Sequence, residues 1–148
     1  MPKFVLLALV ITASWAADAK VQYAGGTIGG LKPGVHGTIG VAGDRELAYD
    51  TGKGDIVIVA YDRINLLEYG QQVNRRLVMA VVISPAFLLA KSRKHFLTIG
   101  YQDGDGKQQA MVFRVDKNGI RATLVSLEAR TGLKIQYQDE EARKAGKG

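Results

Sequence analysis

The sequence predicts a mainly β domain that ends in an α-helix. Three observations favour this class: short runs in which apolar and polar residues alternate, glycine-rich turns between those runs, and one helical repeat near the C-terminus. The chain has 148 residues, of which 18 are Gly and 3 are Pro, and 47% are hydrophobic. This length supports one domain with a proper core, and the composition is typical of an ordered, turn-rich protein.

The first 19 residues have the pattern of a signal peptide. Lys3 precedes a largely apolar run over residues 4–13, and small residues follow it. Both Ala19 and Ala16 end a tripeptide of the small-x-small kind, so cleavage after either residue is consistent with the pattern. The apolar run is shorter than the about 20 residues that span a bilayer. We therefore expect an exported protein, periplasmic or secreted, with membrane association as an alternative.

Short strands separated by turns are expected over the first half of the remaining chain. The expected strands are residues 21–23, 36–42, 45–50, 55–61 and 66–71, with a turn at 62–65. Gly-Thr-Ile-Gly occurs twice, at residues 26–29 and 37–40. A phosphate-binding glycine loop would continue into Lys-Ser/Thr or a long helix, and neither copy does. Neighbouring strands whose backbones approach closely explain these glycines better.

A hairpin followed by a helix is expected over residues 94–132. Period-2 alternation on both sides of the Asp103–Gly106 turn predicts two half-buried strands. Asp116 is expected to cap a helix over residues 117–131, and Gly132 to end it in the left-handed conformation. The apolar face of this helix is formed by Ile120, Leu124, Leu127 and Thr131.

The C-terminal residues are expected to contribute one strand and a tail. Leu133–Tyr137 alternates like a strand. Residues 138–148 are highly charged and lack core residues, so this tail is expected to be a frayed helix or disordered.

The succession of strands resembles bacterial members of the PH-domain-like superfamily, including GRAM-like modules. The resemblance covers residues 21–132 and rests on a hydrophobic pattern at Gly37–Val41, Leu47–Tyr49, Ile56–Tyr61, Ile64 and Leu66–Gly70. It implies a PH-like bent β-barrel of about seven strands, capped by the C-terminal α-helix, within a domain of residues 20–137. Members of this superfamily bind phosphoinositides, peptides or other proteins. The resemblance thus implies a binding module for an envelope ligand or another protein.

No catalytic or metal-binding set is apparent in the sequence. His36 and His95 both fall in predicted strands, and no His/Asp/Glu cluster has a ligand spacing. No nucleophile-elbow pattern surrounds a serine. The chain has no cysteine, which excludes disulfides and thiolate metal sites. We therefore predict a protein without cofactor or metal that is not an enzyme, with a small hydrolase as the alternative.

The charge favours anionic partners. The formal net charge is +6 and the pI is about 9.6, which suits phospholipid headgroups, cell-wall polymers or nucleic acid. Nucleic acid is the weakest of these, because aromatic residues do not interleave with the basic residues as stacking platforms do.

The strongest candidate interaction segment is an apolar insertion with basic ends. Residues 77–90 are apolar and are interrupted by Pro85, and no acidic residue occurs between Glu68 and Asp103. The segment either enters a membrane interface, where each flanking cation contributes about 1 kcal/mol on anionic headgroups, or packs over the barrel. The candidate contacts to anionic lipid or a partner are Arg75, Arg76, Phe87, Leu88, Lys91, Arg93 and Lys94.

Overall fold

The computed structural model describes residues 18–41, 43–73, 82–83 and 94–147. Nearly all of the predicted signal peptide lies outside the described residues, and so does most of the apolar insertion. In the described part of the chain, no helix is long and apolar enough to cross a membrane.

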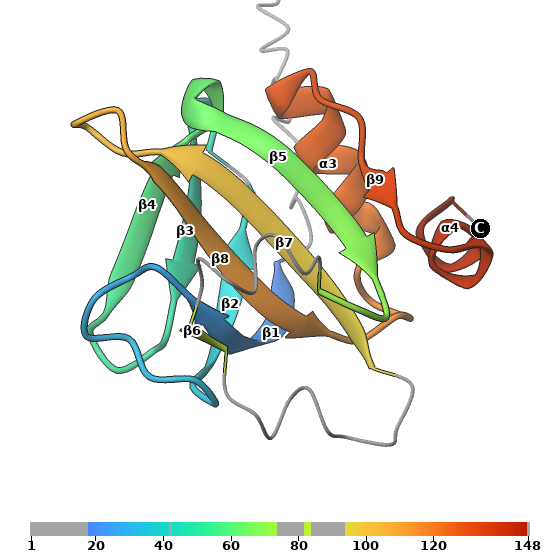
Figure 1. Ribbon diagram of the computed structural model, residues 1–148, viewed down its shortest axis with the longest axis horizontal. Helices are drawn as coiled ribbons and strands as arrows, with labels where there is room; N and C mark the ends of the chain where they lie inside the picture. Colours follow the sequence, from blue (N-terminus) through green and yellow to red (C-terminus); the bar gives the residue numbers. More distant parts are fainter. Residues whose placement is uncertain (1–17, 42, 74–81, 84–93, 148) are drawn as a thin grey trace, which may run out of the picture.

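The protein is mainly β, as the sequence predicts, and its C-terminal part is helical (Figure 1). The strands are β1 (Ala19–Gly26), β2 (His36–Gly40), β3 (Glu46–Asp50), β4 (Ile56–Ala60), β5 (Ile64–Gly70), β6 (Val82–Ile83), β7 (His95–Gln102), β8 (Gln108–Val115) and β9 (Gln136–Tyr137). The helices are the 3-10 helix η1 (Tyr61–Arg63) and the α-helices α3 (Arg121–Thr131) and α4 (Glu140–Lys147).

The nine described strands form one sheet. Its order is β4-β3-β2-β1-β8-β7-β5-β9, and β6 pairs with β1 outside this path. Every pairing is antiparallel except that of β5 with β9. β1 joins the two halves of the sheet, because it pairs with β2 on one edge and with β8 on the other. On one side of β1 lie β2, β3 and β4, and on the other side lie β8, β7, β5 and β9.

The turn between β7 and β8 and the glycine at position 37 follow the sequence prediction. The carboxylate of Asp103 accepts hydrogen bonds of 2.9 Å from the backbone N–H groups of Asp105 and Lys107, which closes the predicted hairpin between β7 and β8. At Gly37, an added Cβ would lie 2.5 Å from the carbonyl oxygen of Asp50. Only glycine allows the backbones to approach this closely. The structural interpretation of the repeated Gly-Thr-Ile-Gly is therefore confirmed at this position.

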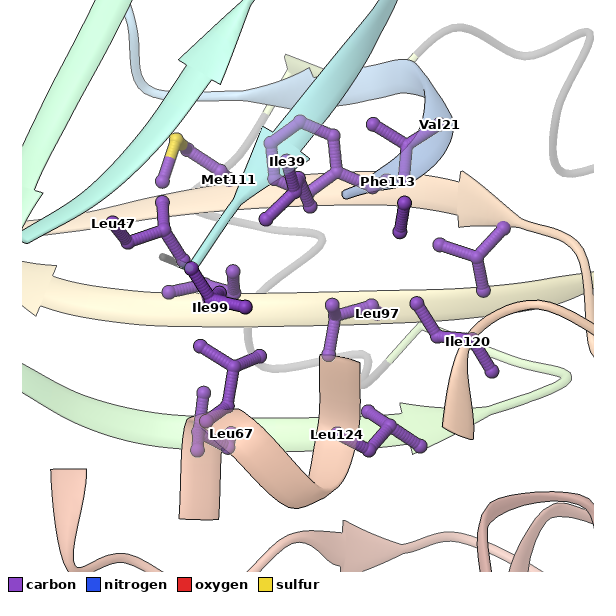
Figure 2. Packing of buried hydrophobic residues seen from close by; sticks show 14 of the residues in the cluster. Val21, Ile39, Leu47, Leu67, Leu97, Ile99, Met111, Phe113, Ile120 and Leu124 are labelled. Carbon is purple, nitrogen blue, oxygen red and sulfur yellow. The ribbon is translucent and has the colours of Figure 1, made fainter. Parts of the chain in front are cut away.

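The main core lies between the sheet and α3. Figure 2 shows side chains from β1, β2, β3, β5, β7 and β8 in one buried cluster with Ile120 and Leu124. Ile120, Leu124 and Leu127 are all buried, as predicted from their helical spacing. At the centre, the ring centroids of Tyr49 and Phe113 are 4.8 Å apart.

The sequence predicts that β7 is half-buried, and this prediction is wrong. Its residues from His95 to Gly100 are buried on both faces of the sheet. On the face opposite α3, Phe96 belongs to a second buried cluster with Ala24, Val73, Ala110 and Val112. The prediction of a half-buried strand depended on Thr98 and Gly100, which are not large apolar residues. Both residues are small enough to be buried, so polarity alone did not reveal the second covered face.

The start of α3 differs from the prediction. The helix begins at Arg121, and Asp116 does not cap it. Instead, the Asp116 carboxylate accepts a 2.9 Å hydrogen bond from the N–H of Asn118, in a turn that precedes the helix. Asp forms such local turns readily, and Gly119 is a poor helix former. The predicted end is confirmed: Gly132 has a φ of 72°, and its N–H donates a 3.0 Å hydrogen bond to the carbonyl of Glu128.

Two further boundaries also differ. The predicted turn over residues 62–65 is wrong, because η1 ends at Arg63 and β5 begins at Ile64. The predicted strand Leu133–Tyr137 is reduced to the two residues of β9.

The C-terminal tail is an ordered part of the fold. Residues 140–147 form α4, whose Ala142 is fully buried in the main core. The Asp139 carboxylate caps this helix by accepting a 2.6 Å hydrogen bond from the Ala142 N–H. The prediction that this tail lacks core residues is wrong. Small alanines can pack closely without the long apolar side chains that signal burial in a sequence.

Candidate anion-binding cleft

A cleft with a volume of about 760 Å³ lies where the beginnings of β1 and β2 meet the end of β8. The start of β7, the turn after β3 and the residues that precede α3 complete its lining. Its charged lining residues are Lys20, Lys94, Arg114 and Lys117, with Asp50 and Asp116.

The strand register brings these residues together. In β1, Val21 and Tyr23 point into the core, so the alternate residues Lys20 and Gln22 lie on the other face. Gln22 is opposite His36 of β2 on one side and Arg114 of β8 on the other. Three adjacent strands therefore present a row of polar side chains to the cleft.

Hydrogen bonds hold this row in place. Arg114 donates from Nη1 to the side-chain oxygen of Gln22, at 3.3 Å. The Gln22 amide nitrogen donates to the carbonyl oxygen of Gly34 at 3.1 Å and lies 3.3 Å from Nε2 of His36. Because the amide of Gln22 is fixed at both ends, it orients the Arg114 guanidinium. That guanidinium has five N–H donors, and a neutral amide oxygen does not neutralise its charge.

The cleft has an excess of positive charge. Four cations and two carboxylates line it, which gives a formal charge of +2 with neutral histidines. None of the four cations forms an ion pair with another described residue. A concave surface with an excess of positive charge concentrates the electrostatic potential and attracts anionic ligands.

His95 forms part of the cleft lining but is almost completely buried, with 2% of its surface exposed. Neither of its ring nitrogens has a hydrogen-bond partner among the described residues. Its ring lies against that of Tyr69, with centroids 5.3 Å apart. Burial lowers the pKa of His95, the carboxylates of Glu141 and Asp139 oppose this effect, and Lys117 adds to it. His95 is therefore a neutral group at pH 7.

One of the predicted contact residues is described by the structure, and it lies at this cleft. Lys94, at the entrance to β7, is half-buried and lines it. The other predicted contacts, Arg75, Arg76, Phe87, Leu88, Lys91 and Arg93, lie outside the described residues.

The remaining cations of the cleft were not predicted from the sequence. Lys20 is far in the chain from Arg114 and Lys117, and the three residues belong to no motif. The sequence did contain a partial signal for their exposure, because Lys20 and Arg114 each occupy an outward position in a strand of alternating apolar and polar residues. Their proximity depends on the pairing of β1 with β8.

The described residues contain no cluster of three or more His, Asp or Glu side chains that could hold a metal ion. The comparisons with known proteins identify no family: no protein-family model and no curated protein matches this chain.

Proposed function

We propose that this protein is a non-catalytic binding module of the PH-domain-like type, exported to the cell envelope, and that it binds an anionic ligand in the cleft. The observation that carries the proposal is the excess of positive charge around one concave surface, where four cations, none in an ion pair with a described residue, outnumber Asp50 and Asp116.

The strand order supports the PH-like part of the proposal. Four consecutive strands, β1 to β4, are followed by β5, β7 and β8, which return to pair with β1. The helix α3 follows β8 and buries Leu124 and Leu127 against the sheet. A seven-stranded barrel with a C-terminal plug would have this succession.

The chemistry of the cleft favours phosphate or carboxylate groups. The guanidinium of Arg114 can form two parallel hydrogen bonds with either group, and lysines add charge without fixed geometry. Anionic polymers and headgroups of the envelope offer repeated groups of this kind.

The proposal is tested by calorimetric titration of the purified protein with inorganic phosphate, pyrophosphate and citrate. Binding should weaken as salt is added, since exposed charges are screened over about 10 Å at 0.1 M ionic strength. Arg114→Ala should weaken binding about 10-fold or more, because a hydrogen bond to a charged group is worth about 1.5–3 kcal/mol.

The matched control is Arg45→Ala, which removes an exposed arginine that does not line the cleft. Equal affinities for the Arg114 and Arg45 variants would reject the cleft as the binding site. The hydrolase alternative would be favoured instead if a broad hydrolase screen found turnover that His95→Ala removed.

The proposal of membrane attachment through residues 75–94 is separate. Of the contact residues proposed for membrane attachment, the structure describes only Lys94. The arrangement of the cleft therefore does not test membrane attachment.

A further inference from the structure

The free edge of β4 has the features of a pairing surface. β4 is the terminal strand of the sheet order, and its only described partner is β3 (Figure 1, left side of the view). Natural proteins usually protect such edges with proline, a charged residue or a bulge. β4 has the sequence IVIVA, and its register with β3 has no shift. None of these protective features is therefore present.

The hydrogen-bond pattern shows which backbone groups face outward. The backbone N–H of Thr51 donates to the carbonyl oxygen of Asp55, and that of Tyr61 donates to the carbonyl oxygen of Arg45. These two bonds lie at opposite ends of the β3–β4 pair. Bonded and non-bonded pairs alternate in an antiparallel ladder. Between these two ends, Val57 and Val59 bond to β3. The N–H and C=O groups of Ile56, Ile58 and Ala60 then point away from the sheet.

The outward-facing residues also expose apolar side chains. Ile56 is 57% exposed and Ile58 is 58% exposed, and the remaining exposed large hydrophobic residue of the described chain is Val125 of α3. Unpaired backbone groups and exposed isoleucines therefore coincide on one strand. A strand that paired here would satisfy the backbone groups and place its own side chains beside both isoleucines.

We propose that β4 pairs antiparallel with β4 of a second copy of this chain, which makes a two-fold symmetric dimer with a continuous sheet. The pattern is self-complementary: a two-fold axis at Ile58 places Ile58 opposite its own copy and Ile56 opposite Ala60. All three residues have the outward hydrogen-bonding groups that such pairs exchange.

The charges at the two ends of β4 are compatible with this arrangement. Lys53 and Asp55 precede the strand, and Asp62 and Arg63 follow it. Antiparallel pairing brings the first end of one copy beside the second end of the other. Each end has one acid and one base, so the ends that meet have no net formal charge, although the whole chain has a charge of +6. The contact is short, so a weak, concentration-dependent dimer is expected.

Sedimentation velocity from micromolar to near-millimolar concentration tests the association, with protein purified from cells that express the full chain. A monomer–dimer equilibrium is expected. Ile58→Lys should weaken it about 10-fold or more, because two lysines would meet at the axis. Val125→Lys is the matched control, since Val125 is also 58% exposed but lies on α3. Both variants should melt like the wild type.

A second pair of variants tests the geometry. The chain has no cysteine, so Ile58→Cys introduces one thiol that faces its copy across the axis. Opposed residues of a hydrogen-bonded antiparallel pair have Cα atoms about 5.5 Å apart, within the range of a disulfide. Under mild oxidation, Ile58→Cys should form a covalent dimer much faster than Val125→Cys.

The proposal is overturned by a protein that stays monomeric at all concentrations, or by species larger than a dimer. It is also overturned if the Ile58 and Val125 variants associate or cross-link alike, since β4 would then not lie at the axis.

Discussion

Gln138, just after β9, donates a hydrogen bond from its side-chain amide to the buried carboxylate of Glu68 in β5. Its amide oxygen accepts a 3.1 Å hydrogen bond from the N–H of Gln72, and its own N–H donates to the carbonyl of Tyr69 at 3.2 Å. An added Cβ at Gly70 would lie 2.7 Å from the Cβ of Gln138. This one residue therefore fastens the chain before α4 to the end of β5.

Gln138→Ala should lower the free energy of unfolding by about 1–3 kcal/mol, because a buried acceptor would lose its partner. The other carboxylate oxygen of Glu68 already lacks a partner among the described residues. Urea unfolding measures the change. Gln136→Ala, an exposed position of β9, is the control. Equal stability losses would contradict a specific role for the Glu68–Gln138 bond.

Leu124→Ala should lower the free energy of unfolding by about 2–5 kcal/mol, because a fully buried side chain of α3 leaves a cavity. Arg121→Ala, at an exposed position of the same helix, should change it little. Thermal melts of the two variants provide the comparison. Similar shifts would show that α3 contributes to stability by something other than its buried face.

Stability should fall on mild acidification because of His95. Its folded pKa lies below the ordinary value of 6.5, so the unfolded chain binds a proton first as the pH falls. The stability associated with the neutral, buried ring is complete above about pH 6.5 and is lost as the pH falls toward the folded pKa. His95→Phe should therefore flatten the dependence of melting temperature on pH between about 7 and 5.

The control for this measurement is His36→Gln, which replaces an exposed histidine. An unchanged pH profile for His95→Phe would show that other groups cause the acid sensitivity.

Phe87→Asp distinguishes membrane insertion of residues 77–90 from packing. Insertion predicts that the wild type sediments with anionic liposomes, and that the variant keeps its melting temperature but loses the binding that survives high salt. Packing predicts a sharp drop in melting temperature, because a charge would be buried, and no liposome binding by the wild type. Co-sedimentation and melting of the two proteins measure both properties. A destabilised variant of a protein that never sediments would end the membrane hypothesis.

If the N-terminus is a signal peptide, we expect cleavage after Ala16 rather than after Ala19. Ala19 is the first residue of β1, is 7% exposed and pairs with Ile39 of β2. Cleavage after Ala19 would remove this residue from the sheet, whereas cleavage after Ala16 leaves β1 complete. Mass spectrometry of the exported protein should find Ala17 at its N-terminus. A mature chain that begins at Lys20 would contradict this expectation.

Local periodicity was sufficient to determine much of the secondary structure. The strands near β2, β3 and β4, the hairpin of β7 and β8, and the buried face of α3 all follow from the spacing of apolar residues over one short segment. The end of α3 follows from the special conformation of Gly132. These features depend on neighbours in the sequence, so a single sequence contains the necessary information.

The tertiary structure decided the features that depend on distant contacts. Ala142 is too small to signal burial by itself, yet α4 packs it into the core. Phe96 and Thr98 are both buried because a second face of β7 is covered. The cleft arises because β1 pairs with β8, which places Gln22 beside Arg114 although 92 residues separate them. Alternation with a period of two indicates which face of the sheet a side chain occupies. Only strand pairing determines which side chains become neighbours on that face.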